Sequence, residues 1–168
     1  MVNIKRWFIH AFMPPWRWRV AFPASLLGEI DMAVEQSESL HRGELRFAIE
    51  NALAPSWVWQ GMSASQRATE VFSNLRVWDT EENSGVLIYL LLADREVDLV
   101  VDRGIAKLVP QAEWDTIAEA MQKEFHRGDF RRGALEGIER ITKILATHFP
   151  SDATNKNELS NTPVIVKR

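Results

Sequence analysis

Polar side chains that can bind a hard cation occur at two points of the sequence. Asp79, Glu82 and Asn83 lie in the loop before the longest apolar run, and Asp102 and Arg103 follow the next alternating segment. If these two apolar segments form a hairpin, the chain returns and Asp102 ends beside Asn83. Carboxylate and amide oxygens are the ligands that Ca²⁺ and Mg²⁺ prefer. The pattern therefore predicts a Ca²⁺ or Mg²⁺ site formed by Asp79, Glu82, Asn83 and Asp102, and the alternative is a solvated acidic turn.

Three strands are expected to position these loops. Residues 44–50 alternate between polar and apolar side chains, which predicts a strand with one polar face near a sheet edge. The continuous apolar run from Val86 to Ala93 is typical of a central strand buried on both faces. Residues 97–101 alternate after a tight turn, which predicts an antiparallel hairpin. A right-handed crossover should make residues 44–50 and the central strand parallel neighbours.

Helical spacing of apolar residues occurs before, between and after these strands. It predicts helices over about 26–40, 63–75 and 110–126, and a final helix that Asp129 caps and Pro150 ends. Ser63 is a good N-cap for the second of them. Helices on both sides of strands favour a three-layer α/β/α sandwich around a mixed sheet.

Composition narrows the class of protein. The chain of 168 residues has a net charge of −3 and no cysteine, so thiolate metal sites and cysteine nucleophiles are excluded and nucleic acid is not an expected partner. A phosphate loop, a paired-histidine zinc helix and a serine elbow are also missing. His10, His41, His126 and His148 fall at helix ends or near the N-terminus, where the helix dipole accounts for three of them. No apolar run is long enough to span a membrane, and we expect a cytoplasmic protein.

The chain is expected to have three parts. Residues 1–22 form an arm rich in aromatic and basic side chains, 23–150 the α/β domain, and 151–168 a flexible tail in which 164–166 can add an edge strand. The arm either packs on its own domain or a second subunit, or contacts the inner face of the membrane as a peripheral anchor. We expect Trp16 and Trp18 to be covered by protein and Trp7 and Phe8 to be the membrane contacts.

Several short motifs give the chain a family resemblance. Residues 83–88 (Asn-Ser-Gly-Val-Leu-Ile), the hairpin after them and residues 102–105 (Asp-Arg-Gly-Ile) resemble the core signature of the TPM domain family. Gly43-Glu44 and residues 125–130 support the resemblance, which covers about residues 23–150. It implies a fold of Rossmann-like appearance and divalent-metal binding, and it implies the acid phosphatase activity attributed to the plant branch of the family.

This chain departs from the long branch of that family. The signal peptide, the C-terminal membrane helix and the Gly-rich tail of that branch are not found in the sequence. Where the family tends to have Gly-Tyr-Gly-Leu-Glu, residues 102–106 are Asp-Arg-Gly-Ile-Ala, so Ala106 replaces a glutamate that can bind metal. Either Asp102 compensates for that glutamate or the site is lost.

Two functions therefore stay open. The leading one is a non-catalytic or weakly catalytic binding or accessory module that assists a protein partner, with a membrane-associated partner as one alternative. The second is a weak metal-dependent acid phosphatase, in which Asp79, Glu82 and Asp102 hold the cation and Arg103 binds the phosphate. The second lacks an obvious nucleophile or a tuned acid and base.

Overall fold

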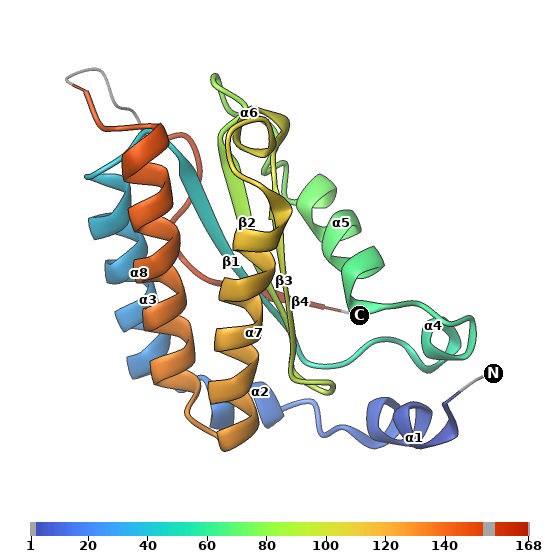
Figure 1. Cartoon of the computed structure of the whole chain (residues 1–168). Helices are drawn as coiled ribbons and strands as arrows, with labels where there is room; N and C mark the ends of the chain where they lie inside the picture. Colours follow the sequence, from blue (N-terminus) through green and yellow to red (C-terminus); the bar gives the residue numbers. More distant parts are fainter. Residues whose placement is uncertain (1–2, 153–156, 168) are drawn as a thin grey trace.

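A computed structural model describes residues 3–152 and 157–167. Within this part of the chain, four strands form one mixed sheet with helices on both faces (Figure 1). The predicted three-layer α/β/α architecture is confirmed. The loops that hold the predicted cation site lie at one end of the sheet, beside α6, and the N-terminal helices α1 and α2 lie at the other end (Figure 1).

The sheet has the order β3-β2-β1-β4. Its strands are β1 (Glu44–Glu50), β2 (Gly85–Leu91), β3 (Glu96–Val101) and β4 (Val164–Val166). As predicted, β2 is fully buried, pairs in parallel with β1 and forms an antiparallel hairpin with β3. The predicted edge strand is confirmed as well, since β4 pairs in parallel with the second half of β1.

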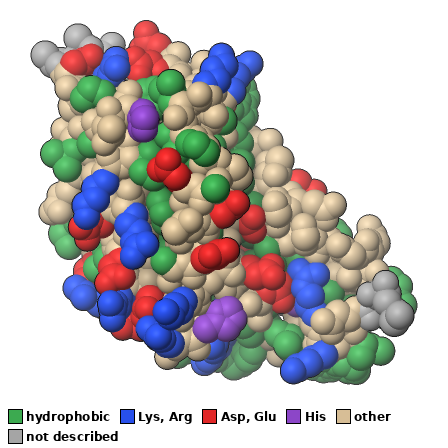
Figure 2. Space-filling model, in the orientation of Figure 1, with side chains coloured by type: hydrophobic (Ala, Val, Ile, Leu, Met, Phe, Trp, Pro, Cys, Tyr) green, Lys and Arg blue, Asp and Glu red, His purple; other side chains and the backbone are tan. Residues whose placement is uncertain are grey.

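One face of the sheet is covered by α3 (Ala24–Glu38), α7 (Gln111–Arg127) and α8 (Phe130–His148). Phe47, Ile88 and Trp114 are completely buried in this layer. Helices α7 and α8 pack closely because Gly133 and Gly137 carry no side chain, and a Cβ at either position would meet Phe125 or Met121. The two signs of charge are mixed on the outer surface over α7 and α8 (Figure 2), where i,i+4 ion pairs form within α8.

The opposite face is covered by α4 (Pro55–Trp59) and α5 (Ala64–Asn74). Ser63 caps α5 in a capping box with Gln66, as its position in the sequence predicts. Pro55 starts the short helix α4, because proline is suited to the first helical turn, where its missing N–H has no partner to lose.

The predicted polar face of β1 is not open to water. Glu44 and Glu50 are buried, because side chains and backbone groups from distant segments bind both carboxylates. Glu44 accepts hydrogen bonds from the backbone N–H groups of Glu158 and Leu159, at 3.1 and 3.0 Å. Glu158 and Leu159 belong to the segment 151–168, which was predicted to be a flexible tail. Their hydrogen bonds to Glu44 hold this segment against β1 shortly before β4 begins. Residues 153–156 and 168 of that segment lie outside the described residues.

The N-terminal arm forms α1 (Ile4–Phe12) and α2 (Arg17–Ala21). Trp18 packs against the core on the α3 side and Trp7 against the core on the α5 side, whereas Trp16 is 60% exposed. The body of the domain thus partly covers Trp7 and Trp18 but leaves Trp16 exposed. Phe8 is exposed, as its expected role requires. Among the described helices, none is long and apolar enough to cross a membrane.

Candidate functional site

The two loops of the predicted cation site meet at the start of β2. The backbone N–H of Asp102 donates to Gly85 at 2.9 Å, and that of Gly104 donates to the carbonyl of Asn83 at 3.0 Å. The Arg103 side chain adds a third link, from Nε to Asn83 Oδ1 at 3.2 Å. The prediction that the hairpin returns Asp102 to the neighbourhood of Asn83 is therefore confirmed.

The approach of the loops depends on a missing side chain. A Cβ on Gly104 would lie 2.5 Å from the carbonyl oxygens of both Glu82 and Asn83. Asn83 itself has a φ of 52°, in the left-handed region that asparagine tolerates better than most residues. As a result, the backbone carbonyls of two successive residues lie against the short helix α6 (Arg103–Ala106).

Asp102 is the most buried of the predicted ligands, with an exposure of 7%. Its Oδ1 accepts from the backbone N–H of Arg103 at 2.7 Å and so caps α6. Its Oδ2 is buried and has no hydrogen-bond partner among the described residues. A buried carboxylate oxygen without a hydrogen bond lowers the stability of the folded state, and a bound ligand would remove that penalty. This atom is therefore the feature of the site that favours a bound ligand.

The other predicted ligands are less available. Glu82 forms an ion pair with Arg42 at 2.5 Å, and Asn83 Oδ1 accepts from Arg103. Asp79 is exposed in the turn before β2. Among the described residues, no group of three or more His, Cys, Asp or Glu side chains is arranged to hold a metal ion. The residues thus fit a cation only in part. Asp102 has a carboxylate oxygen without a hydrogen-bond partner among the described residues, whereas the Glu82 carboxylate is paired with Arg42.

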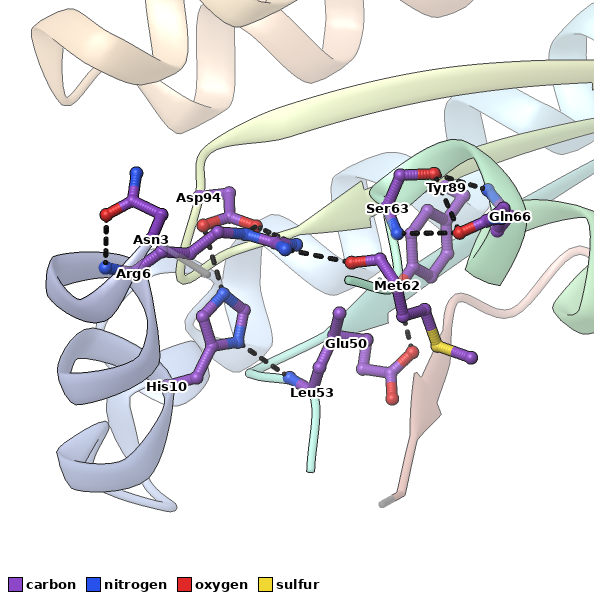
Figure 3. A network of polar contacts seen from close by, with 10 residues as sticks. All are labelled: Asn3, Arg6, His10, Glu50, Leu53, Met62, Ser63, Gln66, Tyr89 and Asp94. Carbon is purple, nitrogen blue, oxygen red and sulfur yellow. Dashed lines mark hydrogen bonds and ion pairs between the residues drawn. The ribbon is translucent and has the colours of Figure 1, made fainter. Parts of the chain in front are cut away.

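A second polar cluster, which sequence reasoning missed, lies at the opposite end of the sheet (Figure 3). We call Arg6, His10 and Asp94 the arm clasp, because they tie α1 to the turn after β2. His10 is completely buried, with Nε2 at 3.0 Å from Asp94 Oδ1. Its Nδ1 accepts from the backbone N–H of Leu53 at 2.9 Å, so the ring proton is on Nε2 and points to Asp94. Arg6 binds the other carboxylate oxygen at 2.9 Å and the carbonyl of Met62 at 2.8 Å.

The clasp sets the charge state of its carboxylate. Burial alone would raise the pKa of Asp94, but hydrogen bonds from His10 and Arg6 outweigh it and lower that pKa. Both oxygens of the Asp94 carboxylate therefore accept hydrogen bonds, one oxygen from His10 and the other from Arg6. The sequence predicts no partner for His10, and its main contacts come from another part of the chain.

A buried ion pair holds α5 to the sheet beside the clasp. Glu50 Oε2 accepts from Arg67 Nε at 2.9 Å and from the Tyr89 hydroxyl at 2.8 Å. The Arg67 guanidinium also stacks over Trp57, at 4.7 Å from the ring centroid. Burial and the neighbouring Glu50 carboxylate raise the pKa of Tyr89. No local pattern could reveal this group, because its members are far apart in the sequence and meet only across neighbouring elements.

Comparison with known proteins identifies the family. A sequence model of the TPM domain matches residues 22–144. This chain belongs to the TPM domain family. Among solved structures, it is similar to the BA42 protein of the psychrophilic bacterium Bizionia argentinensis, with 31% identity and a TM-score of 0.76 over 86% of this chain and 95% of that one. A domain from P. gingivalis, 16% identical, shares the fold with a TM-score of 0.62 over 77% and 81% of the two chains. Among curated proteins, no match is found.

Some features of this chain lie inside the range that the TPM domain model matches, and others lie outside it. Both loops of the predicted cation site and all of α3 to α7 lie inside residues 22–144. Helices α1 and α2 and strand β4 lie outside it, and so do Arg6 and His10 of the arm clasp. The arm and the last strand therefore lie outside the matched range, packed at the carboxyl ends of β1 and β2.

Proposed function

We propose that this TPM domain is a binding module in which one hard divalent cation joins the two loops at the start of β2. The supporting observation is the buried Oδ2 of Asp102, which has no protein hydrogen-bond partner at the point where the loops meet. The backbone carbonyls of Glu82 and Asn83 lie against Gly104, two residues after Asp102 along the chain. Oxygen atoms of these kinds are the ligands that Ca²⁺ accepts in flexible arrangements.

We expect rearrangement of the loop before β2 to supply two further ligands. Glu82 can bind the cation after leaving Arg42, and the lost ion pair is partly exposed, so this costs less than about 1 kcal/mol. Asp79 is exposed on the same loop and completes the set. A site that must rearrange and that keeps water ligands binds weakly, and we expect a dissociation constant on the order of 0.1–1 mM for Ca²⁺.

A titration followed by NMR tests this proposal. Ca²⁺ and Mg²⁺ should shift amide resonances of residues 79–85 and 102–106, and Asp102→Asn should weaken the response at least tenfold. Asparagine is as good an N-cap as aspartate, so this variant keeps the cap of α6. Asp115→Asn, an exposed aspartate on α7, is the matched control and should leave binding unchanged. Shifts confined to other residues, or an undiminished response in Asp102→Asn, would refute the proposal.

Weak phosphomonoester hydrolysis is the alternative function, and the exposed Arg103 beside Asp102 is the observation that favours it. A cation would supply charge neutralisation, and Arg103 would bind the phosphate. We expect turnover to be feeble, because neither loop brings a histidine or a second buried carboxylate to this point among the described residues. Hydrolysis of a generic aryl phosphate with several divalent metals is the assay. Robust turnover that Asp102→Asn abolishes would make the enzyme the better description.

The arm supplies a second binding surface, for which we propose a peripheral contact with anionic membrane lipids. Ile4, Phe8 and Phe12 form one exposed stripe of α1, with Phe12 73% exposed. The exposed side chains of Lys5, Arg17 and Arg19 provide positive charge nearby, a combination typical of interfacial helices.

Cosedimentation with phosphatidylglycerol vesicles tests the lipid contact. Phe8→Ser combined with Phe12→Ser should lose most of the binding, because both rings are exposed and neither supports the core. Trp78→Ser, an exposed aromatic near the cation loops, is the control and should bind as the wild type does. Equal cosedimentation of all three proteins would argue against lipid binding by the arm.

A further inference from the structure

A cavity of about 520 Å³ lies between the arm and the sheet, at the opposite end from the cation loops. Its floor is Asn51, directly after β1, together with the end of β4, and its walls come from the arm. The lining residues are Ala11, Met13, Pro15, Trp18, Arg19, Asn51, Ile165, Val166 and Lys167. Its volume is within the range of small-molecule sites, about 300–1,000 Å³.

The position of the cavity in the fold favours a ligand site. The chain leaves β1 toward β2 on one side, whereas β4 flanks β1 on the other side. The cavity therefore opens at the carboxyl ends of two parallel strands. In open α/β sheets, ligands bind in the crevice outside the carboxyl ends of the strands.

The entrance is built from the arm and held in place by the sheet. Asn51 donates from Nδ2 to the carbonyl of Pro14 at 3.0 Å, which fixes the link between α1 and α2 above the cavity. The arm clasp anchors α1 on the same side. A wall held by hydrogen bonds at two points keeps its shape, and preorganisation of this kind favours binding.

The chemistry of the lining selects the ligand. The apolar side chains come from alanine, methionine, proline, tryptophan, isoleucine and valine. Among the described residues that line the cavity, the charged ones are Arg19 and Lys167 and none is acidic. The Arg19 guanidinium lies over the Trp18 ring at 5.1 Å, so positive charge is held beside the apolar wall. We propose that this cavity binds a small amphipathic anion, an aliphatic chain that ends in a carboxylate.

Decanoate is the probe for this proposal, used with the full chain. It should shift the resonances of Trp18, Asn51, Ile165 and Val166, and decyltrimethylammonium, which has a similar chain and the opposite charge, should not. Replacing both Arg19→Gln and Lys167→Gln should weaken decanoate binding by about tenfold, as expected for two partly exposed charge contacts. Lys123→Gln removes an exposed charge of α7 that does not line the cavity, and it should have no effect.

A variant that fills the cavity gives an independent test. Ala11→Phe places a ring in the space between α1 and β4, and it should abolish the shifts without changing the response to Ca²⁺ at the other end of the sheet. If Ala11→Phe does not fold, the pair of charge variants still decides the question. Binding of decyltrimethylammonium at the same residues, equal weakening by Lys123→Gln, or shifts scattered outside the cavity would overturn the proposal.

Discussion

Replacement of Glu38 by glutamine should stabilise the protein at pH 8 and leave it nearly unchanged at pH 5. Glu38 lies at the end of α3 and is 6% exposed, and its Oε1 accepts from the backbone N–H of Leu45 at 3.1 Å. Burial raises the pKa of Glu38 from 4.5 to about 8, since the Leu45 hydrogen bond and the nearby Arg46 only partly offset the loss of water. Glutamine keeps an acceptor for Leu45 and carries no charge.

The sign of the effect follows from proton binding. Between pH 4.5 and 8 the folded protein keeps Glu38 protonated while the unfolded chain has released the proton, so stability falls as the pH rises. Each pKa unit is worth about 1.36 kcal/mol, which gives an upper limit of about 3.5 kcal/mol lost between pH 5 and pH 8. Local opening can hydrate the carboxylate at a lower cost, so we expect Glu38→Gln to gain about 1–3 kcal/mol at pH 8.

Urea denaturation at both pH values, followed by tryptophan fluorescence, measures this difference. Burial lowers the pKa of His41 to about 4, so His41 also makes stability pH-dependent, with a loss as the pH falls below 6.5. Comparing each variant with the wild type at the same pH removes most of that contribution. Glu35→Gln, one turn earlier on α3 and exposed, is the control. A gain that is equal at pH 5 and pH 8, or that Glu35→Gln reproduces, would contradict the role assigned to Glu38.

Two other substitutions test the contacts at the two ends of the sheet. Asp94→Asn should loosen the arm, because it removes the negative charge that Arg6 and His10 bind. Trypsin should then cut the exposed arginines of α2 faster than in the Glu96→Gln control, and equal rates would count against the clasp. Gly104→Ala should lower the free energy of unfolding by about 1–3 kcal/mol, because its methyl group would meet two backbone carbonyls at 2.5 Å. Gly28→Ala, which has open space in α3, should instead raise it by about 0.5–1 kcal/mol, and urea denaturation distinguishes the two results.

The layers of the fold could be predicted because their signals are local. The apolar run in β2 is uninterrupted, and the Ser63 cap stands at the start of an amphipathic α5. Parallel pairing of β1 with β2 then follows from the handedness of the crossover, and the meeting of the two loops follows from the hairpin. These steps need only chain order and side-chain periodicity.

The partners of the polar residues could not be predicted in the same way. Glu44 and Glu50 have the alternation of a solvent-facing strand side, yet each is buried because partners distant in sequence bind its carboxylate. Likewise, Glu82 belongs to the predicted ligand set, but Arg42 reaches it from the start of β1. Which cation pairs with which carboxylate depends on packing between elements, and residue spacing along the chain does not contain that information.

The arm shows how a few such contacts change the role of a segment. Its aromatic and basic composition predicts either packing on the domain or contact with a membrane, and the structure places different side chains of the arm in each situation. Buried His10 and half-buried Trp18 bind it to the body, while the exposed Phe12 and Trp16 leave an apolar surface outside. His10 is completely buried and bonds both to Asp94 and to the backbone N–H of Leu53, so moving the arm away would break both hydrogen bonds. The arm is therefore a fixed wall of the cavity, and any lipid it meets contacts the outer surface of a segment that the domain already holds.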